Sequence, residues 1–178
     1  MGFYKNVTSN NQFQKKQQGV VWGKDPKHFQ GKISMLQSIA SISHLVSTAI
    51  SPVFEHPNVE WVGHSNSQGW SNLLSSSKFL LGLGDPLLGP SAIDAIIHGC
   101  VYINPIYGSA VRDGAYASQH PYAAERIGDP YVCSYHMGNN DELRKCVEYA
   151  LVSNLKPLLP SDFEWINYLG RVIELFSL

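Results

Sequence analysis

The segment FLLGLGDPLLGPSAIDAIIHGCVYINP, residues 79–105, constrains the fold more than any other part of the chain. Its first apolar run, 79–83, predicts a buried strand, and the turn that follows is rich in glycine and proline. A short helix over 93–97 is expected next, ended by Gly99, and the apolar residues 101–103 predict another strand. A strand, a helix and a strand in this order are typical of a parallel α/β sheet.

The rest of the chain continues this alternation of strands and helices. Before the segment, the pattern predicts a strand at 19–23, a long amphipathic helix from Gly31 to the stop at Pro52, a strand at 59–63 and a short helix from Trp70 to about Ser77. After it, the pattern predicts a strand at 131–135 and two helices, the first opened by capping residues 139–141 and the second carrying Ile166, Leu169, Ile173 and Phe176. No periodicity is visible between Pro105 and Tyr131, and an irregular segment of that length is more often functional than idle.

Length and charge favour one domain that binds a small ligand. The chain has 178 residues, 44% of them hydrophobic, which is enough to bury one substantial core. Residues 1–18 are polar without apolar periodicity, so we expect a flexible lead-in there and a domain over 19–178. Thirteen Lys and Arg residues oppose fourteen Asp and Glu residues. This balance gives no electrostatic footprint for a nucleic acid or an anionic membrane.

Targeting signals and cysteines leave the compartment open. The sequence has neither an apolar run of about eighteen residues nor a secretory signal, so the chain as given is expected to be soluble. Asn6-Val7-Thr8 is an N-glycosylation acceptor triplet, usable if the chain is luminal or secreted. The cysteines Cys100, Cys133 and Cys146 show no CxxC spacing. We therefore expect core thiols rather than a zinc or redox site.

Several catalytic motifs are excluded by spacing. The GLGDPL stretch has Leu87 where a dinucleotide-binding GxGxxG motif needs its third glycine. The GHSNS stretch, 63–67, has serine where a nucleophile elbow needs its second glycine, which disfavours hydrolase chemistry. The seven histidines include no metal-ligand pair at helical spacing, so no metal site is expected.

The turn inside the 79–105 segment is the remaining candidate site. Gly84 and Gly89 allow backbone conformations closed to other residues, Pro90 stiffens the turn, and Ser91 can cap the following helix. Such a turn predicts outward-pointing amides at a helix N-terminus, where roughly half a positive charge favours a phosphate. Asp94, one turn into the helix, can accept hydrogen bonds from a ribose diol.

A purely structural interpretation of the same residues stays open. Glycine and proline also make tight strand-to-helix turns that bind nothing. A first-turn carboxylate such as Asp94 is favoured by the helix dipole alone. The residues of the turn do not by themselves decide between a ligand site and a connection.

Two blocks of sequence resemble a known family. The blocks are GLGDPLLGPSAIDAIIHGCVYINP and SQHPYAAERIGDPYV, and the similarity extends upstream to VVWGKD and HFQGK and downstream to LKPLLPSDF. Together they resemble the C-terminal part of glycosyltransferase family 18, the N-acetylglucosaminyltransferase V family, over most of residues 19–165.

The resemblance implies a fold, an activity and a location. The fold is a Rossmann-like parallel sheet with helices on both faces, here the C-terminal, donor-binding half of a GT-B glycosyltransferase. The family transfers N-acetylglucosamine from UDP-GlcNAc in β-1,6 linkage to a mannose of an N-glycan, with inversion and without a metal or other cofactor. Its members are Golgi proteins held by a membrane anchor, which here would lie outside the chain. Gly84, Gly89, Pro90 and Ser91 would then surround the diphosphate, and Asp94 the ribose.

The chain also departs from the family pattern. Leu88 occupies the place of a glutamate before the Gly-Pro pair, and Asp94 is one methylene shorter than a glutamate inside the helix. The stretch between Pro105 and SQHPY is shorter than in the family. The N-terminal GT-B half, expected to bind the acceptor and supply the catalytic carboxylate, is missing. We therefore name no catalytic residue and expect no catalysis by the chain alone.

Two rival interpretations remain. A truncated or divergent relative could keep the fold as a non-catalytic binding module, and Leu88 and the short loop fit that case. A retaining GT-B transferase would place two acidic residues around the helix start, which Leu88 disfavours. The coding sequence upstream of Met1 would discriminate best, since an anchor and a second α/β region favour the enzyme.

Overall fold

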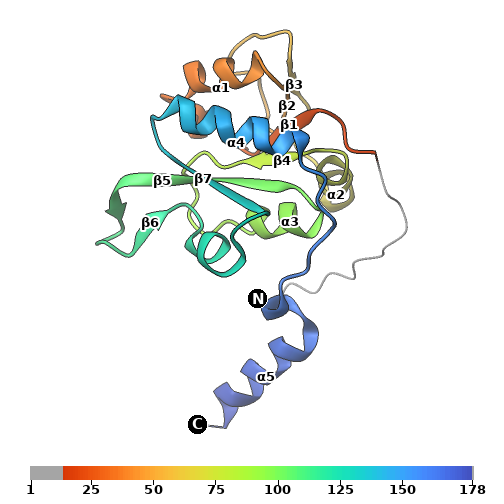
Figure 1. The fold of residues 1–178 in the computed structure, drawn as a ribbon, viewed down its shortest axis with the longest axis vertical. Helices are drawn as coiled ribbons and strands as arrows, with labels where there is room; N and C mark the ends of the chain where they lie inside the picture. Colours follow the sequence, from red (N-terminus) through yellow and green to blue (C-terminus); the bar gives the residue numbers. More distant parts are fainter. Residues whose placement is uncertain (1–13, 178) are drawn as a thin grey trace.

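The computed structural model describes residues 14–177 (Figure 1). The Asn6-Val7-Thr8 triplet and most of the predicted lead-in at 1–18 lie outside these residues. Within them, the first strand begins at Gln18, inside the stretch predicted to be flexible.

A seven-stranded sheet forms the centre of the molecule, with strand order β3-β2-β1-β4-β5-β6 and with β7 also paired to β5. All pairs are parallel except that of β5 with β6. The strands are β1 (Gln18–Val21), β2 (His44–Ser47), β3 (Val59–Trp61), β4 (Phe79–Leu81), β5 (Val101–Val111), β6 (Tyr116–Ser118) and β7 (Val132–His136). The predicted parallel α/β sheet is confirmed.

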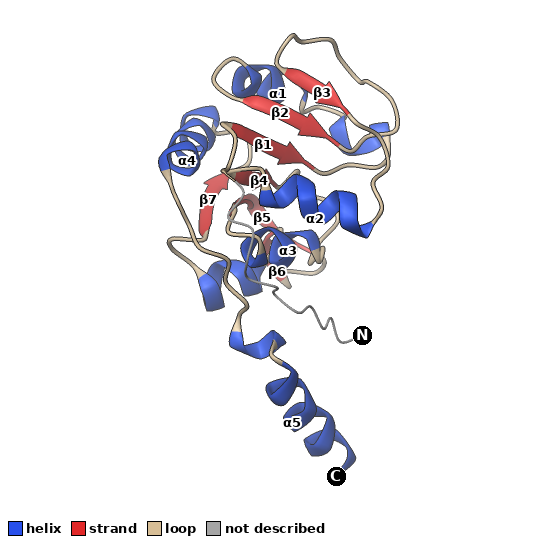
Figure 2. Ribbon diagram, turned by 90° about the vertical axis from the view of Figure 1, so that its right-hand side faces the viewer, coloured by secondary structure: helices blue, strands red, loops and turns tan. Residues whose placement is uncertain are grey.

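Helices cover both faces of this sheet, as Figures 1 and 2 show. The α1 and α4 helices lie over one face, and α2, α3 and the π-helix η2 lie over the other. The helices are α1 (Ile33–Ala40), α2 (Ser67–Ser75), α3 (Ser91–Ile97), α4 (Asn140–Val152) and α5 (Trp165–Phe176), with the shorter η1 (Pro26–Phe29), η2 (Ala123–Ile127) and η3 (Ser161–Phe163).

The strands divide their side chains between two cores because successive residues point to opposite faces. On β1, Val21 belongs to the core with α1 and α4, whereas Val20 belongs to the core with α2 and α3. Leu80 and Leu81 on β4 divide in the same way. Strands buried on both faces produce the continuous apolar runs of the sequence.

The long helix predicted from Gly31 to Pro52 is wrong beyond Ala40. The chain leaves α1 there and returns as β2, whose Leu45 and Val46 are only 1% and 3% exposed. The apolar residues of this stretch recur at a spacing that suits a helix. Because β2 lies between β1 and β3 and is covered on both faces, burial in the sheet decides its structure.

The stretch between Pro105 and Tyr131 is more regular than predicted. The β5 strand continues to Val111, turns at Arg112 and Asp113 with φ angles of 50° and 56°, and returns as β6. Val111 pairs with Tyr116, so the turn has four residues, and Gly114 also has a positive φ, at 83°. The outer half of β5 is exposed, so it carries no apolar alternation that the sequence could reveal.

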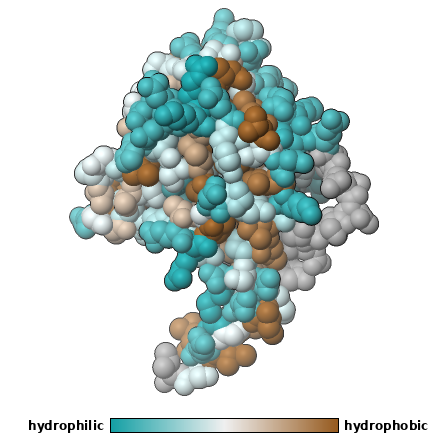
Figure 3. All heavy atoms as spheres, in the orientation of Figure 1, coloured by the Kyte–Doolittle hydropathy of each residue, from teal (hydrophilic) through white to brown (hydrophobic). Residues whose placement is uncertain are grey.

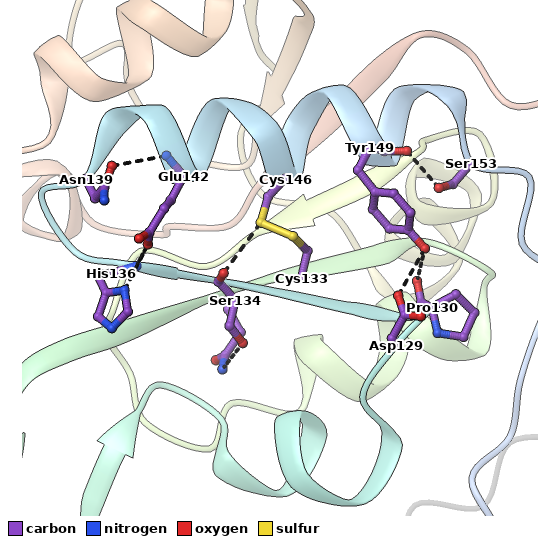
Figure 4. The surroundings of a disulfide bond; sticks show 11 residues. Asp129, Pro130, Cys133, Ser134, His136, Asn139, Glu142, Cys146, Tyr149 and Ser153 are labelled. Atoms are coloured by element: carbon purple, nitrogen blue, oxygen red, sulfur yellow. Dashed lines mark hydrogen bonds and ion pairs between the residues drawn. A yellow bond between two sulfur atoms is a disulfide. The ribbon is translucent and has the colours of Figure 1, made fainter.

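A disulfide joins Cys133 on β7 to Cys146 on α4 (Figure 4). The expectation of core thiols is therefore wrong for these two residues and holds for Cys100, which is free and buried. Sequence spacing could not reveal the pair, because the packing of α4 on β7 brings the two cysteines together. The bond closes a separation of 13 residues and fixes the helix to the sheet.

The α5 helix projects from the body at the C-terminus (Figures 1 and 2). None of its residues is buried, and apolar side chains gather on it in Figure 3. The most exposed of these are Ile166, Ile173, Leu175 and Phe176 at 64% to 83%. No helix within residues 14–177 is both long enough and apolar enough to cross a membrane.

Candidate functional site

The strand order reverses between β1 and β4, which defines where a ligand would bind. From β1 the chain builds β2 and β3 on one side, and β4 and β5 lie on the other. In open α/β sheets, ligands bind outside the carboxyl ends of the strands at such a switch point, because the loops there diverge and leave a crevice.

A cavity of about 290 Å³ opens at this point of the sheet. It is near the lower end of the roughly 300 to 1,000 Å³ typical of small-molecule sites. The loops after β1, β2, β3 and β4 and the first turns of α2 and α3 line it, through Trp22, Lys24, Thr48, His64, Ser65, Asn66, Ser67, Trp70, Pro86, Gly89, Pro90, Ser91 and Asp94. Figure 2 shows α2 and α3 side by side over the same face of the sheet.

The structure brings four of the five predicted site residues together on one wall. Gly89, Pro90, Ser91 and Asp94 all line the cavity. Gly84 does not; a Cβ added there would meet Met137 Sδ at 3.0 Å and Tyr107 Cε1 at 3.6 Å. Its φ of +86° is one that other residues rarely adopt, so the sequence argument for this glycine holds for the shape of the turn.

Two details of the predicted turn need correction. Ser91 is the first residue of α3 and makes no capping bond, because Pro90 occupies the cap position. Gly89 is not at positive φ, and a Cβ there would meet Ser91 Oγ and Pro86 Cγ at ordinary distances of 3.5 and 3.8 Å. The strained residue of the turn is Leu88, whose φ of +54° is unusual for a side chain branched at Cγ.

Asp94 ties α3 to α2. Trp70 Nε1 donates a hydrogen bond to Asp94 Oδ2 at 3.0 Å. This bond orients the indole and the carboxylate on adjacent parts of the cavity wall. An aromatic face beside an acceptor can hold a planar ring together with a hydroxyl or amide.

The loop between β4 and α3 is held by groups from outside it. Gln119 Oε1 accepts a hydrogen bond from Gly84 N at 2.9 Å, and Gln119 Nε2 donates to Pro86 O at 3.0 Å. Tyr107 Oη donates to Gly84 O at 2.6 Å. Burial raises the pKa of Tyr107 to about 12, so the hydroxyl stays protonated and keeps donating at neutral pH.

His120, in the second sequence block, forms hydrogen bonds to β5 and to η2 close to this loop. The Nδ1 atom of His120 accepts a hydrogen bond from Ala123 N at 3.1 Å, at the start of η2. His120 N donates to Asn104 Oδ1 at 3.0 Å. Burial lowers the pKa of His120, which favours the neutral imidazole that an accepting Nδ1 requires.

Sequence reasoning missed more than half of the cavity wall. Trp22 and Lys24 follow β1, Thr48 follows β2, and the GHSNS stretch that fails as a nucleophile elbow supplies His64 to Ser67. For Trp22, Lys24 and the 64–67 stretch, the one available signal was a position at the end of a predicted strand or shortly after it. For Thr48 even that signal was hidden, because β2 was predicted as helix.

Within residues 14–177, no group of three or more His, Cys, Asp and Glu side chains is arranged to hold a metal ion. The polar lining consists of hydroxyls, an amide, one lysine, one histidine and one carboxylate. Such a set suits hydrogen bonding to an anionic, hydroxyl-bearing ligand.

The fold is that of a doubly wound α/β domain, and its cavity lies at the switch point of the sheet, where domains of this class bind their ligands. The family can be stated directly: the chain belongs to glycosyltransferase family 18, whose model matches residues 2–177. This result confirms the family resemblance of the sequence.

Curated relatives are longer proteins. The chain is 27% identical to the human alpha-1,6-mannosylglycoprotein 6-beta-N-acetylglucosaminyltransferase A over 176 residues, 91% of this chain and 24% of the relative. It is 29% identical to the Caenorhabditis elegans alpha-1,6-mannosylglycoprotein 6-beta-N-acetylglucosaminyltransferase over 179 residues, 89% of this chain and 26% of the relative. The chain thus spans about a quarter of the length of the relatives it matches.

Solved structures of GT-B type share the fold. The Methanocaldococcus jannaschii UDP-GlcNAc 2-epimerase in complex with UDP-GlcNAc and UDP superimposes with a TM-score of 0.59 at 13% identity, over 93% of this chain and 46% of the epimerase. Spinosyn forosaminyltransferase superimposes with a TM-score of 0.50 at 14% identity, over 93% of this chain and 45% of that chain. The Rossmann-like fold is confirmed, and it corresponds to about half of each GT-B protein.

Proposed function

We propose that this chain is the donor-binding part of an inverting N-acetylglucosaminyltransferase that transfers N-acetylglucosamine from UDP-GlcNAc in β-1,6 linkage to a mannose of an N-glycan. The observation that carries the proposal is the cavity at the switch point of a family 18 chain. The named activity of the relatives supports the reaction, and the epimerase with bound UDP-GlcNAc supports the class of donor.

The cavity offers suitable groups for each part of a nucleotide sugar. Lys24 and the hydroxyls of Ser65, Ser67 and Ser91 can hold diphosphate oxygens, together with the backbone amides of the turn at Gly89. Asp94 can accept hydrogen bonds from the ribose, and Trp70 or Trp22 offers a flat apolar wall. The charge of the leaving diphosphate would be met by these groups without a metal or other cofactor.

The remainder of the reaction requires groups outside this chain. Deprotonation of the mannose hydroxyl by a carboxylate of the missing N-terminal half would allow in-line attack on the anomeric carbon, with inversion. The acceptor N-glycan would bind mainly to that half. We therefore propose that the isolated chain binds donor and does not transfer sugar.

A luminal location is part of the proposal. Structural disulfides form and persist in oxidising compartments, and Cys133–Cys146 is such a bond. This bond supports the Golgi lumen implied by the family. No part of the proposal involves a nucleic acid.

A non-catalytic binding module is the second candidate. Leu88 favours it, because this exposed apolar side chain stands where the family pattern has a glutamate beside the donor turn. A module of this kind would keep the fold and bind the nucleotide, but would remain inactive after the N-terminal half is supplied.

Calorimetric titration of UDP and UDP-GlcNAc into the folded chain tests the proposal. We expect saturable binding of both. Lys24→Ala should weaken it by about tenfold or more, the range for losing a charged hydrogen-bond partner. The matched control is Lys145→Ala, which removes an exposed lysine on α4 at the opposite face. Absence of UDP binding by the folded chain would overturn the donor-site assignment.

An activity assay separates the two candidates. The chain alone should give no transfer to an N-glycan acceptor, whereas adding the N-terminal half of a family member should restore transfer. Binding of UDP without transfer in that reconstituted mixture would favour the binding module.

A further inference from the structure

Gln119 connects the two main sequence blocks of the family resemblance. It lies in the SQHPY block, and its hydrogen bonds reach the GLGDPLL turn some 35 residues earlier. We propose that Gln119 is the positioning residue that sets the shape of the 82–88 loop and so places Gly89 and Ser91 on the cavity wall. The proposal rests on the donor site described above and assigns Gln119 no contact with the donor.

Each polar group of Gln119 is used to fix this loop or to anchor the residue itself. Its side chain accepts from Gly84 N at 2.9 Å and donates to Pro86 O at 3.0 Å. Its carbonyl oxygen accepts from Leu88 N at 3.0 Å, and its own N–H donates to Pro105 O at 2.9 Å. The residue is only 8% exposed, so breaking any of these bonds would leave a buried group unsatisfied.

The loop needs such support because one of its two residues at positive φ, Leu88, does not favour that conformation, whereas glycine at position 84 does. Gly84 has φ +86° and Leu88 has φ +54°. For a residue like leucine, left-handed backbone is unfavourable because Cβ crowds the carbonyl oxygen. Leu88 keeps this conformation where its N–H is bound by the Gln119 carbonyl. Tyr107 is a second support, through its bond to Gly84 O.

Gly82 shows how closely Gln119 approaches the chain. A Cβ on Gly82 would lie 2.4 Å from Gln119 Oε1 and 2.9 Å from Ile103 O. Glycine at this position therefore leaves room for the Gln119 side-chain amide to reach the loop. The two glycines of GLG are needed for different reasons, Gly82 for this close approach and Gly84 for its positive φ.

Gln119 does not line the large cavity, so it would influence ligand binding only by holding the 82–88 loop in place. It borders a second hollow of about 10 Å³, roughly the space of one water molecule. This hollow shares Trp22, Gly89 and Ser91 with the large cavity, whose lining does not include Gln119. Movement of the loop would therefore displace two residues of the proposed diphosphate site.

The test compares two buried glutamines. Gln119→Met keeps the length of the side chain and removes its hydrogen bonds, and Gln18→Met does the same at the other end of the sheet, where Gln18 Nε2 donates to Ser77 Oγ at 3.0 Å. Gln119→Glu is the harsher variant, because a carboxylate oxygen still accepts from Gly84 N but the other oxygen faces the Pro86 carbonyl and adds a buried charge. For each variant of the 178-residue chain we would measure the melting temperature, hydrogen exchange of the Gly84 amide and calorimetric affinity for UDP.

We expect Gln119→Met to speed exchange at Gly84 and to weaken UDP binding by about tenfold or more. The loss should be at least as large for Gln119→Glu, and affinity should stay within about twofold of wild type for Gln18→Met. Wild-type exchange at Gly84 and wild-type UDP affinity in either folded Gln119 variant would overturn the proposal. If wild type itself fails to bind UDP, the donor site falls and takes this proposal with it; if wild type binds UDP and the Gln119 variants bind equally well, this proposal alone falls.

Discussion

The amino and carboxyl edges of the sheet each contain a buried glutamine, and the two edges use it differently. At the amino edge, Gln18 is 6% exposed and its side chain bonds to Ser77. At the carboxyl edge, Gln119 is 8% exposed and its side chain bonds to the backbone of Gly84 and Pro86. The burial and the chemistry are similar, whereas the partners are not.

The amino edge is closed by contacts between segments that are already ordered. Lys15 Nζ donates to Ser77 O at 2.6 Å, and the Cys100 thiol donates to Leu74 O at 3.0 Å, so carbonyls at the end of α2 and just after it are satisfied. Burial lowers the pKa of Lys15. Gln18 adds one bond between strand ends that backbone pairing also holds.

The carboxyl edge is open because its loops diverge there. The 82–88 loop has no neighbouring strand to pair with beyond Gly82 N, which donates to Ile103 O. Side chains must therefore replace the backbone ladder. We therefore expect equally buried residues at the two edges to lose similar stability on substitution, whereas only substitutions at the carboxyl edge should weaken ligand binding.

The largest effect is expected for Gly99→Ala at the amino edge. Gly99 has φ +69°, and an added Cβ would lie 2.7 Å from Leu155 O, a backbone atom that cannot turn away. The conformational penalty and the overpacking together should lower the free energy of unfolding by about 3 kcal/mol. Urea denaturation would measure the loss. The UDP affinity of the folded fraction should stay unchanged. A weakened affinity would contradict the claim that only the carboxyl edge of the sheet affects ligand binding.

The next effect is expected for Gly84→Ala at the carboxyl edge. Its φ of +86° predicts a loss of about 1 to 2 kcal/mol of stability, and the contacts nearest to an added Cβ are the flexible Met137 side chain. Because the loop carries the cavity wall, UDP binding should weaken as well, unlike in Gly99→Ala. Gly89→Ala is the matched control for stability, since ordinary contact distances surround that position. A Gly84→Ala variant with wild-type affinity would contradict the proposed role of the loop.

The sequence predicts the centre of the fold well because the Gly and Pro residues that end helices and strands agree there with the apolar periodicity. From Phe79 to Pro105, each apolar run is bounded by Gly or Pro, and β4, α3 and the start of β5 occur where expected. The β2 strand was missed because its apolar spacing also fits a helix. What decides between them is the burial of both faces by distant segments, which local spacing does not contain.

The candidate site is only partly predictable for a similar reason. Gly89, Pro90, Ser91 and Asp94 stand together in the sequence, so a local argument finds them. Lys24 and the His64–Ser67 stretch enter the site through other loops, and Gln119 reaches Gly84 across 35 residues. The SQHPY motif was visible, but its physical role depends on a contact that forms after folding.

A smaller effect is expected from pH, through His120. Burial lowers the folded-state pKa of His120 below the unfolded value of about 6.5. The unfolded state then binds more protons in that range, so the contribution to stability is present above the unfolded pKa and is lost as pH falls below it, at up to about 1.4 kcal/mol per pH unit. Urea denaturation between about pH 7 and 5 would show the slope. His120→Asn should flatten it, and an unchanged slope in that variant would contradict this assignment.

The smallest effect is expected for α5, which belongs to neither edge. Deletion of residues 165–178 removes a helix with no buried residue, so the melting temperature should fall by no more than a few degrees, about 1 kcal/mol or less. UDP affinity should be unchanged. Thermal melts and calorimetry of the shortened chain would check both. A large loss of melting temperature or of UDP affinity would show that α5 contributes to the folded body or to the ligand site.

Amide chemical-shift mapping during a UDP titration tests the central claim most directly. We expect the amides of Gly89, Ser91 and Asp94 at the carboxyl edge to shift progressively and saturate, because they line the cavity at the switch point. The amides of Gly19, Lys78 and Val101 at the amino edge should keep their positions. Shifts centred on the amino edge, or no saturating shift at Gly89, Ser91 and Asp94, would contradict the account.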